Sequence, residues 1–133
     1  MSGRILVVDD SGLARRRARA MLESAGYEVL EAEDGMAALE RYFVARPDLV
    51  VLDLVMKGMY GLDVLAKLRE MDSGARVIVV SADVQTSSQE LVTAAGGVGF
   101  LIKPLEAEQF LPLVRSTLNA EGNSTLDAEG KWS

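Results

Sequence analysis

Five short apolar runs, separated by longer stretches with helical periodicity, limit the fold of this chain more than any other feature. Strands buried on both faces of a parallel sheet read as continuous apolar runs of this kind, rich in Val, Ile and Leu. Alternation of such strands with helices is typical of βαβ units in an α/β domain. The runs are Ile5–Val8, Tyr27–Ala32, Leu49–Leu52, Val77–Val80 and Phe100–Ile102. We therefore predict one parallel sheet with helices between its strands.

The stretches between the runs place apolar residues at the spacing of one helical face. These faces comprise Ala14, Ala18, Met21, Leu22 and Ala25 in the first stretch, Leu62, Leu65, Leu68 and Met71 in the third, and Phe110, Leu111, Val114 and Leu118 in the fifth. The second apolar run differs from the others because Glu28 and Glu31 interrupt it. That interruption predicts an edge strand.

The length of the chain, 133 residues, suits one ordinary domain. We assign residues 1–120 to that domain. Small and polar residues without apolar periodicity dominate from Asn119 onward. We interpret residues 121–133 as a polar tail, the start of a linker or an extension of the last helix, and we expect Trp132 to lie outside the core.

Composition excludes several kinds of chemistry. The chain has no cysteine and no histidine, which rules out disulfides, zinc–thiolate sites, thiol nucleophiles and histidine acid–base catalysis. Its net charge of −6 argues against direct binding to nucleic acid or to an anionic membrane. The basic cluster at Arg15–Arg17 and Arg19 is interpreted as a solvated helix face. The apolar runs are too short to span a membrane, so a cytoplasmic protein is expected.

Polar side chains that suit a metal or phosphate site follow four of the runs. Asp9 and Asp10 follow the first run, Asp53 the third, Ser81 the fourth and Lys103 the fifth. The carboxyl ends of parallel strands meet at one edge of a sheet, where open α/β sheets bind ligands. Carboxylates on neighbouring strands, about 4.8 Å apart, repel one another unless a cation offsets their charge. Without histidine or cysteine, a metal must be a hard cation held by oxygen, and Mg²⁺ is the leading candidate.

Each of these side chains also has an ordinary structural interpretation. Taken alone, Asp9 and Asp10 are better explained as caps of the next helix, although Ser11 can itself serve as the N-cap. The later serine and lysine, taken alone, read as a helix cap and a solvated side chain. Taken together, the set favours a phosphoryl group held between Mg²⁺ and an ammonium. Asp53 is then the candidate nucleophile, because carboxylates form acyl phosphates.

The chain resembles the receiver domains of bacterial two-component response regulators, including the single-domain chemotaxis type. The matching stretches are Ile5–Asp10, Asp48–Met56, Gly61–Leu65, Val77–Ala82 and Gly99–Pro104, spread over residues 4–118. As a set they are highly specific, although any one of them would be weak. The resemblance implies a flavodoxin-like doubly wound (βα)5 fold with five parallel strands in the order 2-1-3-4-5.

The resemblance also implies a metal site and a phospho-acceptor. By position, Asp53 matches the phosphorylated aspartate. Asp10, Asp53 and the backbone carbonyl of Val55 match the direct ligands of Mg²⁺, the expected cofactor. Asp9 matches the carboxylate that acts mainly through a water molecule.

Phosphate contacts and a switch follow from the same resemblance. Lys103 would hold the phosphate charge, beside a cis bond to Pro104. Ser81 and the backbone N–H of Ala82 would bind phosphate oxygens after phosphorylation. Phe100 matches the aromatic switch residue that turns inward when Ser81 moves, and an ordinary core phenylalanine is the alternative for this position.

Two departures from the family pattern concern the rim of the site. Lys57 and Gly58 follow Met56 where the family commonly has proline, which should loosen this loop. Val55 and Asp83 occupy positions that influence how water reaches the acyl phosphate. We expect them to alter the rate of dephosphorylation, in a direction that the sequence leaves open.

The function implied is a phosphorylation switch that catalyses only its own phosphorylation and slow autodephosphorylation. The phosphohistidine donor belongs to a partner histidine kinase, because this chain has no histidine. A surface formed by the fourth helix (about 84–95), the last strand and the fifth helix would signal to a downstream protein or output domain. The protein would act as a monomer or as a phosphorylation-linked dimer.

Three other readings compete with this one. A phosphatase of the haloacid-dehalogenase type needs an aspartate two residues after the nucleophile, where this chain has Val55. A flavodoxin would place a flavin phosphate where Asp9 and Asp10 repel it, and aromatic residues make up only 5% of the chain. A receiver that only docks to partners is disfavoured because the whole set of site residues is present, although Lys57 leaves some room for it.

Overall fold

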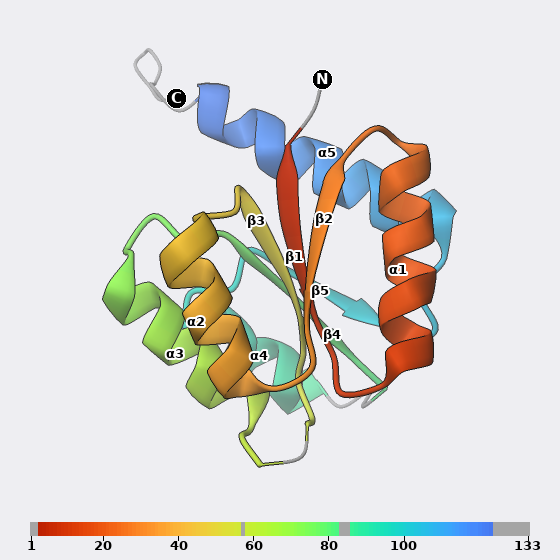
Figure 1. Ribbon diagram of the computed structural model, residues 1–133. Coiled ribbons are helices and arrows are strands. Elements are labelled where there is room, and N and C mark those ends of the chain that lie inside the picture. The colour runs from red at the N-terminus through yellow and green to blue at the C-terminus, as the bar shows by residue number, and fades with distance from the viewer. Residues whose placement is uncertain (1–2, 57, 83–85, 124–133) are drawn as a thin grey trace.

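The computed structural model describes residues 3–56, 58–82 and 86–123. Five parallel strands form one sheet in the order β2-β1-β3-β4-β5, as predicted. The strands are β1 (Arg4–Val8), β2 (Glu28–Ala32), β3 (Leu49–Asp53), β4 (Val77–Ser81) and β5 (Gly99–Ile102). The helices are α1 (Gly12–Ser24), α2 (Gly35–Ala45), α3 (Gly61–Met71), α4 (Thr86–Ala94) and α5 (Ala107–Asn123). Helices α1 and α5 cover one face of the sheet, and α2, α3 and α4 cover the other (Figure 1).

Alternate strand residues enter two separate cores, one on each face of the sheet. Leu6 and Leu52 pack in the core beneath α2 and α3. Their neighbours Val7 and Val51 pack in the core beneath α1 and α5. Because successive side chains point to opposite faces, burial on both faces explains why these strands read as unbroken apolar runs. The strand β2, interrupted by glutamates, lies at an edge as predicted.

The predicted helical faces are largely buried. Ala18 and Leu22 of α1, Leu65 and Leu68 of α3, and Phe110 and Val114 of α5 are all at most 2% exposed. The predicted faces extend too far at two helix ends. Ala25, which caps the C-terminus of α1, is exposed, and Met71, the last residue of α3, is 39% exposed. Both lie where the helix has run past the edge of the core.

The register of the strands places the site residues at the same level along the sheet. Val8 of β1 lies opposite Leu52 of β3, so the next residues, Asp9 and Asp53, lie at the same level. The last residue of β4, Ser81, lies opposite Ile102 of β5, and Lys103 follows directly. The ends of β1, β3, β4 and β5 therefore deliver their polar residues to one edge.

The C-terminal helix continues to Asn123, three residues beyond the predicted domain boundary at 120. Trp132 lies outside the described residues. Within the described part of the chain, no helix is long and apolar enough to cross a membrane.

Candidate phosphorylation and metal site

Three carboxylates meet at the carboxyl edge of the sheet. One oxygen from each of Asp9, Asp10 and Asp53 lies within 4.8 Å of the other two. Asp9 and Asp53 are buried, at 6% and 7% exposure, and Asp10 is exposed. The structure therefore brings together the three acidic residues that the sequence predicted to converge, with one of them open to solvent.

Lys103 reaches back across the edge to two of these carboxylates. Its Nζ donates to Asp9 Oδ2 at 2.8 Å and lies 3.5 Å from Asp53 Oδ2. The other oxygen of Asp9, Oδ1, accepts a hydrogen bond from the backbone N–H of Ser11 at 2.9 Å. Ser11 is the N-cap of α1, as predicted, and accepts from the N–H of Ala14. Asp9 therefore belongs to the charged cluster and binds the backbone of the N-cap residue, whereas the cap of α1 itself is Ser11.

Burial and mutual repulsion govern the ionisation of Asp53. Removal from water, with the negative charge of Asp9 adding to it, raises the pKa of Asp53 from 3.8 to about 6, although Lys103 and the Val55 N–H oppose the rise. Burial alone would lower the pKa of Lys103, but its hydrogen bond to Asp9 and the charges of Asp53 and Asp9 raise it instead. The site therefore holds an ammonium beside a carboxylate that is poorly stabilised as an anion.

These residues fit a small hard cation. Carboxylate oxygens are the ligands that Mg²⁺ prefers, and three of them lie close enough to share one ion. Burial is the main cause of the raised pKa of Asp53, and the negative charge of Asp9 adds an excess of repulsion. A divalent cation would relieve that excess, and the exposed Asp10 leaves the cluster open to solvent on one side.

The remaining predicted site residues line the same edge. Ser81, only 1% exposed, ends β4, and its backbone carbonyl accepts from the Lys103 N–H at 2.9 Å. Ala82 is exposed beside it. Val55 is 61% exposed, and its N–H lies 3.5 Å from Asp53 Oδ1. The roles in phosphate and metal binding predicted for these three residues stay predictions.

Phe100 lies on β5 opposite Val79. It is half-buried and packs against the core beneath α2 and α3. This position lies between the buried interior and the outer surface of the edge strand. The Lys103–Pro104 bond is cis, as expected. Lys57, which replaces the usual proline of the loop after Met56, and the rim residue Asp83 both lie outside the described residues.

One residue of the site escaped the functional analysis of the sequence. Gly61 opens α3, and its N–H donates to the Leu54 carbonyl at 2.7 Å. A Cβ at this position would lie 2.6 Å from the Asp53 carbonyl oxygen and 2.7 Å from the Leu54 carbonyl oxygen. Only glycine allows α3 to approach the end of β3 this closely. Its place in a motif was visible in the sequence, but its contact with the backbone of Asp53 was not.

The basic cluster of α1 is only partly the solvated face that was expected. Arg15 donates to the Asp9 carbonyl at 2.7 Å and to Glu31 Oε1 at 2.9 Å. Arg19 donates to Glu31 Oε2 at 2.7 Å. Glu31 therefore ties α1 to the edge strand, and its partner Arg15 also binds the backbone carbonyl of Asp9. Arg16 and Arg17 are exposed, as predicted.

Comparisons with known proteins point to one family. The model of the response regulator receiver domain matches residues 5–115. The chemotaxis protein CheY of Bacillus subtilis is 38% identical over 120 residues, covering 90% of this chain and all of that protein. The probable transcriptional regulatory protein TcrX of Mycobacterium tuberculosis is 33% identical over 124 residues, covering 93% of this chain and 53% of that protein.

Solved structures agree with these sequence matches. A chain of the CheX–CheY–BeF3–Mg²⁺ complex from Borrelia burgdorferi superposes with a TM-score of 0.82 at 31% identity, covering 85% of this chain and 87% of that one. A CheY-like receiver domain from Methanospirillum hungatei superposes with a TM-score of 0.86 at 24% identity, covering 92% of this chain and 98% of that one. The second likeness supports the flavodoxin-like fold.

Proposed function

Because this chain belongs to the response regulator receiver family, we propose that it is a phosphorylation switch whose acceptor is Asp53. Members of this family act in two-component signalling, where histidine kinases phosphorylate them and output partners read the result. The observation that carries the assignment of Asp53 is its position: it is a buried carboxylate with Lys103 Nζ 3.5 Å away and two further carboxylates within 4.8 Å. It is a signalling domain and not a classical enzyme.

The proposed reaction transfers a phosphoryl group from a phosphohistidine of the kinase. A carboxylate oxygen of Asp53 attacks phosphorus in line, a P–O bond forms, and the P–N bond to the partner's imidazole breaks. The electron pair of that bond stays on the imidazole nitrogen. Lys103, already ammonium, offsets the charge on the transferred oxygens. With a pKa of about 6, Asp53 is mostly the nucleophilic anion at neutral pH.

We propose that Mg²⁺ is the cofactor, held by Asp10, Asp53 and the backbone carbonyl of Val55, with Asp9 acting through water. When bound, the ion supplies positive charge that lowers the repulsion between the carboxylates and the incoming phosphoryl group. The fit of the three carboxylates supports this assignment. The Borrelia burgdorferi structure, a complex with BeF3 and Mg²⁺, supports it by analogy.

The switch itself is proposed to use Ser81, the backbone of Ala82, and Phe100. Ser81 lies beside the Lys103 backbone at the ends of β4 and β5, so a new bond to a phosphate oxygen at Ser81 would act on both strands. Phe100 lies on the same edge strand. Movement of the serine toward the phosphate would free space for the ring, shifting the population of conformers.

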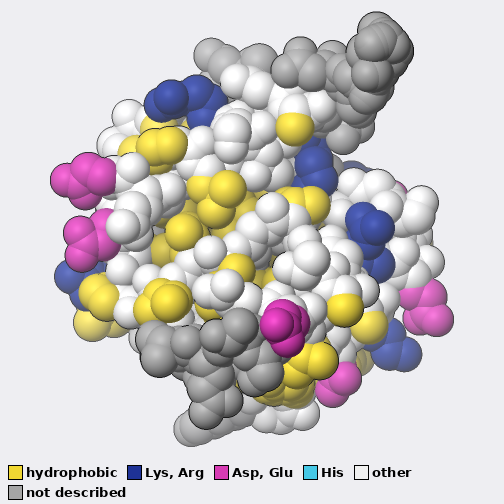
Figure 2. All heavy atoms as spheres, turned by 180° about the vertical axis from the view of Figure 1, so that it is seen from behind, with side chains coloured by type: hydrophobic (Ala, Val, Ile, Leu, Met, Phe, Trp, Pro, Cys, Tyr) yellow, Lys and Arg dark blue, Asp and Glu magenta, His cyan; other side chains and the backbone are white. Residues whose placement is uncertain are grey.

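The surface that signals to the partner is proposed to be α4, β5 and α5. Hydrophobic side chains gather in a hollow over β5, between α5 and α4 (Figure 2). Leu91 of α4, Val98 before β5 and Ile102 of β5 are 53%, 47% and 40% exposed. An apolar patch of this kind on a small domain is typical of a protein-binding site. The partner is a downstream protein or an output domain.

The finer points of assembly follow as proposals. Residues 1–120 would form the receiver domain, with 121–133 as a tail or linker. The domain would work in the cytoplasm, as a monomer or a phosphorylation-linked dimer. The net charge of −6 supports the expectation that this domain does not itself bind nucleic acid or a membrane.

The experiment that tests the proposed function is incubation with acetyl phosphate and Mg²⁺, followed by intact-mass measurement. Wild type should gain one phosphoryl group that hydroxylamine removes and that EDTA prevents from forming. Asp53→Asn should gain none, while Asp63→Asn, a change at an exposed carboxylate of α3, should react like wild type. An adduct retained in Asp53→Asn would refute the assignment. No adduct in wild type, together with no Mg²⁺ binding, would favour the receiver that only docks to partners.

A further inference from the structure

Arg15 of α1 joins the edge strand β2 to the residue that follows β1. Its Nε donates to Glu31 Oε1 of β2 at 2.9 Å, and its Nη1 donates to the backbone carbonyl of Asp9 at 2.7 Å. The side chain of Arg15 is only 17% exposed, and that of Glu31 is 24% exposed. Because a guanidinium is planar and its donors point in fixed directions, the two bonds together fix the Asp9 carbonyl relative to β2.

The carbonyl that Arg15 binds belongs to the peptide group between Asp9 and Asp10. The carboxylate of Asp9 has partners of its own, because its oxygens accept from the Ser11 N–H and from Lys103 Nζ. Asp10, by contrast, is exposed and lies two residues beyond the end of β1. Because a peptide group is planar, the direction of the Asp9 carbonyl also sets the direction in which the chain enters Asp10. The bond from Arg15 therefore constrains the backbone of a predicted metal ligand.

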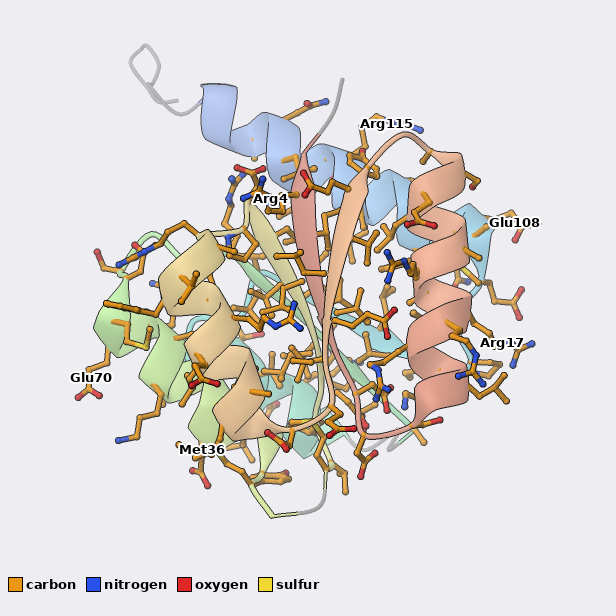
Figure 3. The ribbon with its side chains drawn as sticks, viewed as in Figure 1. Arg4, Arg17, Met36, Glu70, Glu108 and Arg115 are labelled. Carbon is orange, nitrogen blue, oxygen red and sulfur yellow. The ribbon has the colours of Figure 1, made fainter. Side chains whose placement is uncertain are left out.

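Glu31 keeps Arg15 in this orientation. Its second carboxylate oxygen, Oε2, accepts from Arg19 at 2.7 Å, so each oxygen of Glu31 binds one arginine of α1. The hydrogen bond from Arg19, with that from Arg15 adding to it, lowers the pKa of Glu31 although burial opposes the shift. Glu31 is therefore an anion at neutral pH. Arg17 of the same helix differs from both arginines, because it is exposed and extends from α1 away from the sheet (Figure 3).

From these contacts we infer that Arg15 is a positioning residue for Asp10, which holds the Asp10 carboxylate beside Asp53 and thereby raises the affinity of the site for Mg²⁺. One oxygen of Asp10 lies within 4.8 Å of one oxygen of Asp53. The inference rests on the Mg²⁺ site proposed above. The charge of Arg15 alone would have the opposite effect, because a guanidinium repels a nearby cation. Loss of Arg15 should therefore weaken Mg²⁺ binding, whereas a role through charge alone would make the loss strengthen it.

The test measures the dissociation constant of Mg²⁺ by isothermal titration calorimetry on the unphosphorylated protein. Arg15→Met should weaken Mg²⁺ binding about tenfold, the lower end of the effect expected for a residue that orients a metal ligand. Arg15→Lys keeps the charge and one donor, so it should restore part of the lost affinity. Arg17→Met removes the same charge from an exposed position of the same helix. It should change the affinity by less than about twofold, because water and salt screen an exposed charge.

Variants of Glu31 test whether this residue acts through Arg15. Glu31→Gln should weaken Mg²⁺ binding, and the double variant Arg15→Met/Glu31→Gln should bind no more weakly than Arg15→Met. 1H–15N correlation spectra of the metal-free variants show whether each has kept its fold, and Arg15→Gln replaces Arg15→Met if it has not. In these spectra the amide signals of Asp10 and Ser11 should shift most when Arg15 is replaced, because the Asp10 N–H shares its peptide group with the Asp9 carbonyl.

Two outcomes would overturn this inference and leave the proposed Mg²⁺ site standing. Mg²⁺ binding by Arg15→Met that equals or exceeds that of wild type would leave Arg15 without a positioning role. Equal losses in Arg15→Met and Arg17→Met would show that any charge on α1 has the same effect. No Mg²⁺ binding by wild type would instead overturn the proposed cofactor, and this inference with it. One set of titrations therefore distinguishes the failure of the inference from the failure of the proposed site.

Discussion

Lys103 donates to Asp9 at 2.8 Å, although 94 residues separate the two in the chain. The bond joins the end of β5 to the end of β1 across the carboxyl edge of the sheet. It also leaves Lys103 Nζ within 3.5 Å of Asp53. In the metal-free protein, this ammonium therefore offsets the negative charge of two buried carboxylates. Its removal should destabilise the ionised form of both.

We expect a strong energetic coupling between Lys103 and Asp9. Removing the ammonium in Lys103→Met leaves Asp9 as a buried charge without its partner, which is costly. Asp9→Asn keeps the oxygen that accepts from Ser11 and removes only the charge. A double-mutant cycle, measured by urea unfolding at pH 7 in EDTA, should give a coupling of about 1 to 3 kcal/mol. The same cycle on the exposed pair Arg4–Glu28 should give a much smaller value. Additive effects at Lys103 and Asp9 would contradict this prediction.

The metal-free protein should lose stability as the pH rises from about 4 to about 6. Burial and the charge of Asp9 raise the pKa of Asp53 to about 6, so the unfolded chain releases this proton before the native state does. Asp53→Asn removes the free-energy cost of ionising this buried side chain in the native state. In EDTA at pH 7 it should be more stable than wild type by about 2 to 3 kcal/mol, and the difference should shrink below pH 4.

Urea unfolding across this pH range checks the prediction, with Glu33→Gln as a control at an exposed carboxylate. Addition of Mg²⁺ should stabilise wild type more than Asp53→Asn, because the cation offsets the repulsion between the carboxylates of Asp53 and Asp9. A difference between wild type and Asp53→Asn that stayed constant from pH 4 to pH 8 would mean that Asp53 ionises normally in the folded protein.

The parts of the molecule that the sequence predicted share one physical basis. Burial on both faces makes a parallel strand apolar throughout, so the runs ending at Val8, Leu52 and Val80 could be identified as strands. Parallel strands end at a common edge, so Asp53 and Lys103 could be placed near each other. The strand order needed the family resemblance, because several orders are compatible with the same alternation of strands and helices.

The parts that the sequence left open depend on how elements turn and pack against one another. Pairing of Arg15 with Glu31 depends on the rotation of α1 over the edge strand, which a periodic pattern does not specify. The approach of Gly61 to the Asp53 carbonyl depends on the path of a loop. Each is a property of tertiary packing.

The hydroxyl of Tyr42 should contribute to stability through α2 and α3. It donates to Asp72 Oδ2 at 2.8 Å, which joins the buried ring of Tyr42 to the C-terminal cap of α3. Loss of this bond in Tyr42→Phe should cost about 1 kcal/mol at pH 7. Tyr60→Phe, a change at a ring that is 43% exposed, should cost little. Thermal or urea unfolding of the two variants side by side measures the difference.

The same bond should make the stability of the protein depend on pH in the alkaline range. Burial, followed by the hydrogen bond to Asp72, raises the pKa of Tyr42 to about 12. Between about pH 10 and pH 12 the unfolded chain therefore ionises this tyrosine while the native state keeps its proton. The stability of wild type should fall across that window, and the fall should be smaller in Tyr42→Phe. Parallel curves for the two proteins would show that Tyr42 ionises at its ordinary pKa.

Gly61→Ala should damage both stability and phosphorylation. The new Cβ would lie 2.6 Å from the Asp53 carbonyl oxygen and 2.7 Å from Leu54 Cα, and backbone atoms cannot rotate aside as a flexible side chain can. Overpacking of this kind costs about 1 to 3 kcal/mol. To relieve this clash, either α3 or the end of β3 must shift. A shift of β3 moves the nucleophile Asp53 relative to Lys103. The rate of phosphorylation by acetyl phosphate should therefore fall by more than the loss of folded protein explains.

Gly74→Ala is the matched control for this change. Among the described residues, its Cβ would meet only the side-chain oxygen of Asp72, at 3.4 Å, and it lies in an exposed turn after α3, not at Asp53. Unfolding curves establish the folded fraction of each variant, and the phosphorylation rate is compared at equal folded protein. If Gly61→Ala reacts as fast as Gly74→Ala, then the close approach of α3 stabilises the fold without fixing the position of Asp53. A selective loss in Gly61→Ala would show that this glycine positions the nucleophile through the backbone of β3.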